Sequence, residues 1–165
     1  MSRPAEMEAF YDGWTQHQQR LVETLRPLTP EQMQLRPDPG EWPIWRLASN
    51  IAGGRLYWLC SRLHEDDRGV SIDEWGRWWD GEGQSRNADT FVDALTRTWE
   101  VATACLDRWS LADLGREVTS EDSRDQPRTI TRAWVINRLL THETFHGSEI
   151  ALILRMHGLP TALAG

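Results

Sequence analysis

Two histidines near the C-terminal end of the chain, His142 and His146, have the spacing of a metal-binding pair. Residues four apart on a helix differ by only about 40° around its axis, so both imidazoles face the same way. Their row continues through the apolar residues Leu139, Ile150 and Ile153, which predicts that the pair points into the protein. Two neutral imidazoles one turn apart suit a divalent transition metal. The pair also fits a polar patch of core, in which each ring bonds to a neighbour or to water.

The same segment matches the HExxH pattern of zinc metalloproteases, in which Glu143 would be the general base. We reject that interpretation, because such an enzyme needs a third protein ligand and the HExxHxxGxxH extension fails at Glu149. Glu149 cannot easily join both histidines on one ion, since about 10 Å of helical rise separates positions 142 and 149. The third ligand must come from another helix. Glu143 lies about 100° off the histidine row and is expected on the solvent side.

Hydrophobic periodicity predicts the elements that position this pair. Long amphipathic helices are expected over residues 5–25, 43–63, 90–109 and 131–157. No strand pattern competes with them, so the expected fold class is all-α, a four-helix bundle with long connections between helices. A capping box over 29–32 starts a short helical turn, and Gly158 followed by Pro160 ends the last helix. Gly53 and Gly54 interrupt the second helix, as expected where a backbone or a ligand approaches closely.

Two long connections separate these helices. The connection over 65–89 carries Trp75, Trp78 and Trp79 and one short helix that starts at Ser71. Its tryptophans could wall an apolar pocket or pack on the core as a lid. The connection over 110–128 is charged and irregular, and its SEDSRDQ segment, residues 120–126, is expected to be an exposed loop.

Composition describes one ordinary domain spanning residues 1–165, with 39% hydrophobic and 26% charged residues. No apolar run is long enough to span a bilayer and no export signal is visible, so we expect a cytoplasmic protein. The net charge of −7 argues against a nucleic-acid partner. Cys60 and Cys105 lie far apart and are expected to be buried thiols rather than a disulfide. The ten tryptophans favour a large aromatic core.

Two segments resemble the DinB-like (YfiT-like) superfamily. One reads His142-x-x-x-His146-Gly147-x-x-Ile150-x-x-x-Leu154-Arg155-x-x-Gly158-Leu159-Pro160, and the other is the tryptophan-rich second helix, residues 42–58. The resemblance implies a four-helix bundle, often dimeric, with a divalent metal such as zinc or nickel held by three histidines. Members with known activity include metal-dependent thiol S-transferases and isomerases that use low-molecular-weight thiols such as mycothiol or bacillithiol.

Transferred onto this sequence, the resemblance implies metal ligands at His142, His146 and Asn50. Asn50 stands where the second helix of the family carries its histidine, and a neutral amide oxygen is a poorer ligand for zinc or nickel than imidazole. The metal is then held weakly, or another residue substitutes, or the site holds none. His17 is the natural substitute, because it shares the inward row of the first helix; a core histidine with a satisfied hydrogen bond is the alternative. His64 and His157 are expected to face solvent.

The sequence therefore predicts a DinB-like protein, a divalent-metal-dependent transferase that acts on a low-molecular-weight thiol and a small electrophile. The alternative is a non-catalytic, metal-free member of the same fold that acts as a small-molecule binding or dimerisation module. A homodimer is expected on either interpretation. No membrane partner is expected.

Overall fold

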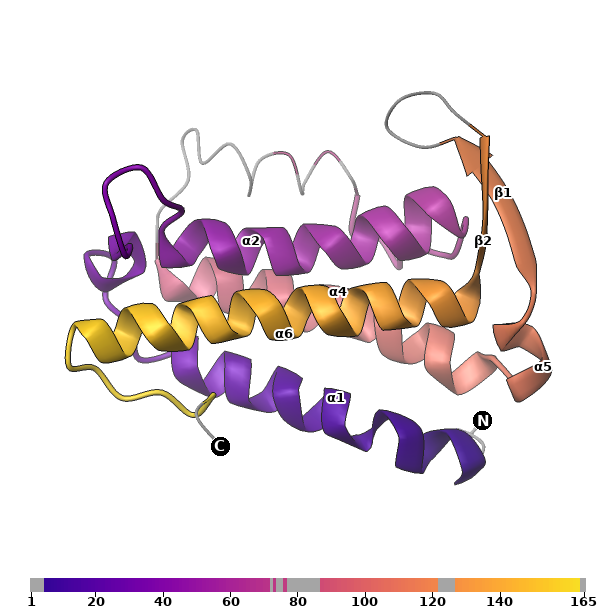
Figure 1. Cartoon of the computed structure of the whole chain (residues 1–165), viewed down its shortest axis with the longest axis horizontal. Helices are drawn as coiled ribbons and strands as arrows, with labels where there is room; N and C mark the ends of the chain where they lie inside the picture. The colour runs from indigo at the N-terminus through magenta and orange to yellow at the C-terminus, as the bar shows by residue number, and fades with distance from the viewer. Residues whose placement is uncertain (1–4, 72, 74–75, 77–86, 122–126, 164–165) are drawn as a thin grey trace.

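The computed structural model describes residues 5–71, 73, 76, 87–121 and 127–163, and long helices form its body (Figure 1). These helices are α1 (Ala5–Leu25), α2 (Ile44–Arg55) with its continuation η2 (Leu56–Arg62), α4 (Ala88–Arg108) and α6 (Arg132–Met156). The predicted all-α class is confirmed. The short helix expected after Ser71, with Trp75, Trp78 and Trp79, lies outside the described residues.

The helix α1 has the bounds that the hydrophobic periodicity predicts. Trp14, Leu21 and Leu25 are buried in one row, and Pro27 follows the helix end because proline cannot continue it. The predicted capping box is present. The Thr29 amide donates to Oε1 of Gln32 at 2.9 Å, and the Gln32 amide donates to Oγ1 of Thr29 at 3.2 Å. These bonds start the short helix η1 (Gln32–Gln34), which leads the chain towards α2.

The helix α2 carries one wall of the candidate site. It begins after Pro43 and buries Ile44, Leu47 and Ile51, as the sequence predicts. Directly after Arg55 the backbone changes to the π-helical turns of η2, in which the hydrogen bonds run from i to i+5. The predicted extent of 43–63 is therefore close to the observed one, whereas the type of helix over the second half differs.

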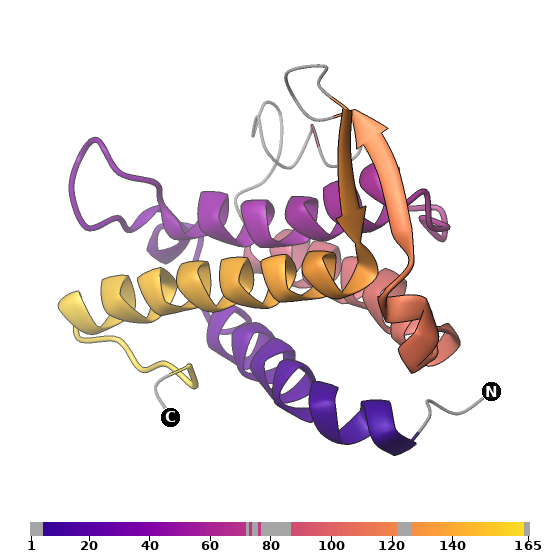
Figure 2. The same ribbon diagram turned by 45° about the vertical axis from the view of Figure 1, so that its right-hand side comes forward.

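The helices α4 and α6 start at side-chain caps. Oδ1 of Asn87 accepts from the Asp89 amide at 3.3 Å, and Oγ1 of Thr131 accepts from the Trp134 amide at 3.1 Å. Gly158, with a φ of +69°, ends α6 in the left-handed conformation that glycine adopts at no steric cost. The helix α6 lies beside α2 and runs in the opposite direction, with α4 behind them and α1 along the other side of α6 (Figures 1 and 2).

The connection before α6 is more regular than its charged, irregular sequence suggests, and most of the loop expected over 120–126 lies outside the described residues. It contains the short helix α5 (Leu111–Leu114) and a hairpin of β1 (Glu117–Glu121) and β2 (Pro127–Thr131). Val118 lies opposite Ile130, which is buried, and the hydroxyls of Thr119 and Thr129 lie 2.9 Å apart across the strands. These two cross-strand pairs support the register of the hairpin.

A cluster around Glu65 joins η2 to the start of α6. Arg132 donates to Oε1 of Glu65 at 2.7 Å, and Arg108 donates to the other carboxylate oxygen. The Trp109 indole also donates to Oε1 of Glu65, at 3.2 Å. This arrangement closes the end of the bundle at which the hairpin stands.

The two cysteines are free thiols, and Cys105 is buried whereas Cys60 is half-buried. Burial raises the pKa of each to about 12, so neither is a thiolate near neutral pH.

A membrane span would need a longer or more apolar helix than any within the described residues.

Candidate functional site

The structure brings Asn50, His142 and His146 together between α2 and α6. The side-chain amide nitrogen of Asn50 lies 3.0 Å from Nε2 of His146. The two imidazole rings are perpendicular, with their centroids 4.6 Å apart. The apolar rows of the two helices predict this convergence, because each row must face the core.

His146 is held at both ring nitrogens. With the NH2 group of Asn50 as donor, Nε2 of His146 is the acceptor in this contact. Nδ1 then carries the proton and donates it to Oε2 of Glu149 at 2.6 Å. The indole of Trp42 stacks on the same ring, with centroids 6.0 Å apart. Three residues therefore fix the orientation and the tautomer of this imidazole.

His142 packs against the second glycine of α2. A Cβ atom on Gly54 would lie only 3.0 Å from Cε1 and 3.2 Å from Nδ1 of His142, so the absence of a side chain makes room for the ring. The close approach expected at Gly53 and Gly54 is thus made by an imidazole. Nδ1 of His142 is buried, and it neither accepts nor donates a hydrogen bond within the described part of the chain. Burial, followed by the neighbouring His146, lowers the pKa of His142 to about 4.

This lowered pKa predicts how stability responds to acid. The ordinary pKa of histidine is 6.5, so between pH 6.5 and about 4 the unfolded chain holds a proton on His142 that the folded chain lacks. The free energy of unfolding therefore falls as the pH is lowered through this window. Burial also lowers the pKa of His17, which acts in the same direction. Urea denaturation at about pH 7 and about pH 5 measures the effect.

The variant His142→Gln separates this histidine from the carboxylates that also titrate in acid. We expect a smaller loss of stability on acidification in the variant than in the wild-type protein. Equal losses would show that His142 does not carry the effect.

His17, the alternative third ligand, faces a different part of α6. Its Nε2 lies 3.3 Å from the backbone oxygen of Glu143, and its ring packs on Gly147. Among the described residues, no three histidine, cysteine, aspartate or glutamate side chains gather closely enough to hold a metal ion. The prediction that His64 and His157 face solvent is confirmed.

The contact between His17 and Gly147 gives a test by substitution. In Gly147→Ala, the new Cβ would lie 2.8 Å from Cε1 of His17, and relieving this overlap should destabilise the protein by about 1–3 kcal/mol. In a His17→Ala background the overlap is absent, and the same substitution should stabilise α6 by up to about 1 kcal/mol because alanine is the better helix former. Chemical denaturation of the four proteins in this cycle measures both effects. Equal effects in the two backgrounds would contradict the contact.

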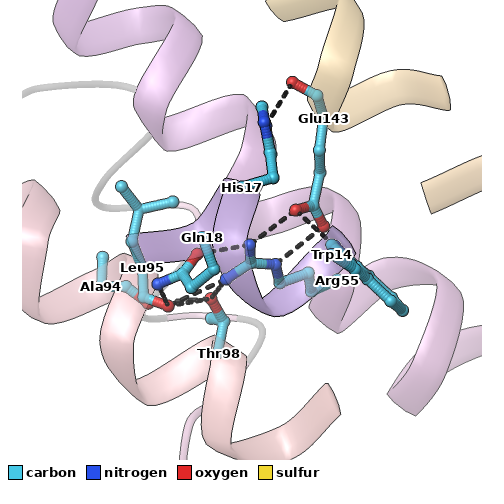
Figure 3. Close-up of polar contacts among 8 residues, drawn as sticks. All are labelled: Trp14, His17, Gln18, Arg55, Ala94, Leu95, Thr98 and Glu143. Atoms are coloured by element: carbon cyan, nitrogen blue, oxygen red, sulfur yellow. Dashed lines mark hydrogen bonds and ion pairs between the residues drawn. The ribbon is translucent and has the colours of Figure 1, made fainter. Parts of the chain in front are cut away.

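Glu143 is not on the solvent side as predicted, because its side chain is buried at the centre of a polar network (Figure 3). Arg55 donates to it twice, from Nε at 2.8 Å and from Nη2 at 2.6 Å, and the Trp14 indole donates at 2.9 Å. Arg55 also donates to Oε1 of Gln18 at 2.7 Å and to the backbone oxygen of Leu95 at 2.9 Å. An arginine paired in this way neutralises the carboxylate, which excludes Glu143 as a freely available general base.

A pocket of about 270 Å³ opens beside His146. Its wall combines apolar side chains with two carboxylates, and it is lined by Pro37, Glu41, Trp42, Leu47, His146, Glu149, Leu152 and Ile153. This volume lies just below the usual range for ligand pockets, so it suits only a small molecule.

The donor set of the site fits a divalent transition metal. His142 is neutral at pH 7, as a metal ligand must be. The bond from Nδ1 of His146 to Glu149 leaves the lone pair on Nε2, which is the arrangement that carboxylates impose on metal-binding histidines. Asn50 would supply its amide oxygen by turning its side chain, because oxygen and nitrogen exchange places in that rotation.

Comparisons with known proteins agree with this architecture. The DinB superfamily profile matches residues 14–150. A DinB-like protein from Bacillus cereus ATCC 10987, known from its crystal structure, superposes with a TM-score of 0.69 at 20% sequence identity, covering 98% of this chain and 97% of that one. A comparison with curated proteins found no match. Because the family profile covers most of its length, the chain belongs to the DinB superfamily.

Proposed function

We propose that this DinB-superfamily protein binds a divalent transition metal through His142, His146 and Asn50 and transfers a group from a small electrophile to a low-molecular-weight thiol. The observation that carries the proposal is the 2.6 Å contact between Nδ1 of His146 and Glu149, at the place where His142, His146 and Asn50 converge. This contact fixes one imidazole with Nε2 directed at Asn50, the residue at which the resemblance to the family implies a third ligand. His142 adds a second neutral imidazole one helical turn away.

The residues around the site support this chemistry. A divalent ion bound there would lower the pKa of a coordinated thiol and so favour the thiolate. The pocket beside His146 offers Leu47, Leu152 and Ile153 as an apolar surface for the body of an electrophile. The sulfur would form the new bond to the electrophilic carbon while the leaving group departs with its electron pair, and the thiol proton passes to solvent. Both cysteines of the chain are protonated near neutral pH, so the thiol must be a substrate.

The second candidate is a metal-free binding module, and one contact favours it. The Asn50 amide nitrogen bonds to Nε2 of His146, the same nitrogen that a metal would require. In that function the two imidazoles and Asn50 offer hydrogen-bonding groups, and the pocket holds a small molecule without converting it.

Zinc and nickel titrations of the untagged full-length protein separate the two candidates. Calorimetry at one pH should detect binding in the wild-type protein and at least a tenfold loss of affinity in both His142→Gln and His146→Gln. His157→Gln, an exposed histidine beyond the end of α6, is the matched control and should bind as the wild type does. Absence of binding, or binding that survives both site substitutions, would overturn the metal proposal and leave the binding module.

The proposal includes a homodimer formed through an apolar face of α6. Phe145, Leu152 and Met156 are 63%, 48% and 57% exposed, and their spacing of seven and four residues puts them on one side of the helix. Thr141 and Ser148 share that side, and the exposed Arg138, seven residues before Phe145, lies on it as well. Such a self-complementary patch suits a two-fold interface.

Light scattering at micromolar concentration should give twice the chain mass for the wild-type protein and the monomer mass for Phe145→Glu. Leu111→Glu changes a similarly exposed residue, 57% accessible on α5, and should remain dimeric. A monomeric wild-type protein would refute the dimer.

A further inference from the structure

Three contacts follow one another along the interface of α2 and α6. Asn50 faces His146, Gly54 faces His142, and Arg55 faces Glu143. From Asn50 to Gly54 the numbers rise along α2 while they fall from His146 to His142 along α6, because the helices are antiparallel. Arg55 and Glu143 each follow one residue after the second contact. One register between these two helices therefore satisfies all three contacts at once.

The third contact is the strongest of the set. Arg55 and Glu143 are both 0% exposed, and their side chains meet through two parallel hydrogen bonds of 2.8 and 2.6 Å. Such a bidentate pair of opposite charges requires a defined position and a defined direction of both side chains.

Two further helices hold the pair in place (Figure 3). From α1, Trp14 donates to the Glu143 carboxylate at 2.9 Å and Gln18 accepts from Arg55 at 2.7 Å. From α4, the backbone oxygen of Leu95 accepts from Arg55 at 2.9 Å. The Arg55 guanidinium also lies 5.1 Å from the centre of the Trp99 ring. The pair is therefore anchored to all four main helices of the described chain.

The apolar residues of α6 decide which side of the helix faces the core, and the ion pair adds a directional contact to that side. This helix buries Ile150 and Ile153, yet it leaves Phe145, Leu152 and Met156 exposed on another side. A slip by one residue would turn each side chain by about 100° and shift it by 1.5 Å. Such a slip would turn buried apolar residues away from the core, and it would also separate Glu143 from Arg55 and leave two unpaired buried charges.

We infer that Arg55 and Glu143 are a positioning pair, which sets the register and rotation of α6 against α2 and so holds His142 and His146 towards Asn50. The pair touches no ligand of the proposed site. The function proposed above rests on this geometry, because His142, His146 and Asn50 form its site. The position of the two helices does not itself depend on metal binding.

The test uses the metal-free full-length protein and the double substitution Arg55→Met with Glu143→Met. Buried ion pairs replaced by apolar residues of similar size commonly leave a folded protein. Circular dichroism should show retained helix and cooperative melting. The nuclear Overhauser effect between Hε1 of His142 and the α-protons of Gly54 should be lost, and the ring signals of His146 should shift. A purely structural pair would change the melting temperature and leave these signals in place.

The matched control is Glu65→Met with Arg132→Met, which removes an ion pair at the start of α6. It should keep the contact between His142 and Gly54. If the Arg55 and Glu143 double variant does not fold, Arg55→Lys takes its place, since lysine keeps the charge but loses the bidentate geometry. That variant should weaken the contact between His142 and Gly54 at least twofold.

Wild-type signals in either folded site variant, or equal changes in the control, would overturn the inference. Failure of the wild-type protein to bind zinc would instead overturn only the proposed function.

Discussion

Replacing Arg55 with methionine alone should lower the free energy of unfolding by about 3–5 kcal/mol, because Glu143 is then buried without a counter-charge. Gln18 and the backbone oxygen of Leu95 lose the same donor. For a chain of this length each kcal/mol shifts the melting temperature by roughly 2–4 °C, so the expected fall is roughly 10 °C. Urea denaturation at pH 7 and thermal melting measure the two quantities.

Arg26→Met is the control for this prediction. Arg26 is exposed just beyond α1, and its replacement should change stability by no more than about 0.5 kcal/mol. Adding Glu143→Met to Arg55→Met should recover most of the loss, since the second substitution removes the unpaired charge. A loss below about 1 kcal/mol in the single variant would mean that water or a rearranged side chain compensates Glu143.

Replacing Asn50 with histidine should strengthen zinc binding at least tenfold, which corresponds to about 1.4 kcal/mol. The substitution exchanges an amide oxygen for an imidazole, the better ligand for zinc and nickel. It also removes the amide NH2 group that bonds to Nε2 of His146, so that nitrogen no longer has to give up a hydrogen bond. Calorimetric titrations of both proteins at one pH give the ratio of dissociation constants.

His17→Ala tests the alternative third ligand in the same titrations. Because the His17 ring packs on Gly147 and lies near the Glu143 backbone oxygen, its loss should leave zinc affinity unchanged within about twofold. If His17→Ala abolishes binding, α1 supplies the third ligand. If Asn50→His binds no more tightly than the wild type, Asn50 does not occupy the ligand position.

The sequence predicts the long helices well because each carries an apolar row whose burial also fixes its extent. The bounds of α1 agree with the periodicity, and α6 begins and ends within one residue of the expected range. The sequence pattern does not predict the hairpin of β1 and β2, and the reason is physical. Its strands contain few apolar residues, and the pairing of Val118 with Ile130 becomes visible only when both strands are present.

The candidate site was predicted in part. The rows that contain Asn50, His142 and His146 are visible on single helices, whereas the partners of those residues depend on how helices meet. The prediction for Glu143 was wrong, because a helical pattern cannot tell which carboxylate has an arginine facing it. One signal was available: Arg55 lies in the row of Leu47, Ile51 and Leu59, all buried, where an arginine requires a buried partner.

The π-helical turns of η2 begin directly after Arg55 and have a consequence for the chain length of this segment. A π-helical turn contains one residue more per hydrogen-bonded ring than an α-helical turn does. Deletion of one residue between Leu56 and Arg62 can therefore be absorbed by conversion to α-helix, without rotating the part of α2 that precedes it. A change of length in η2 would therefore leave the orientation of Asn50, Gly54 and Arg55 on α2 unchanged.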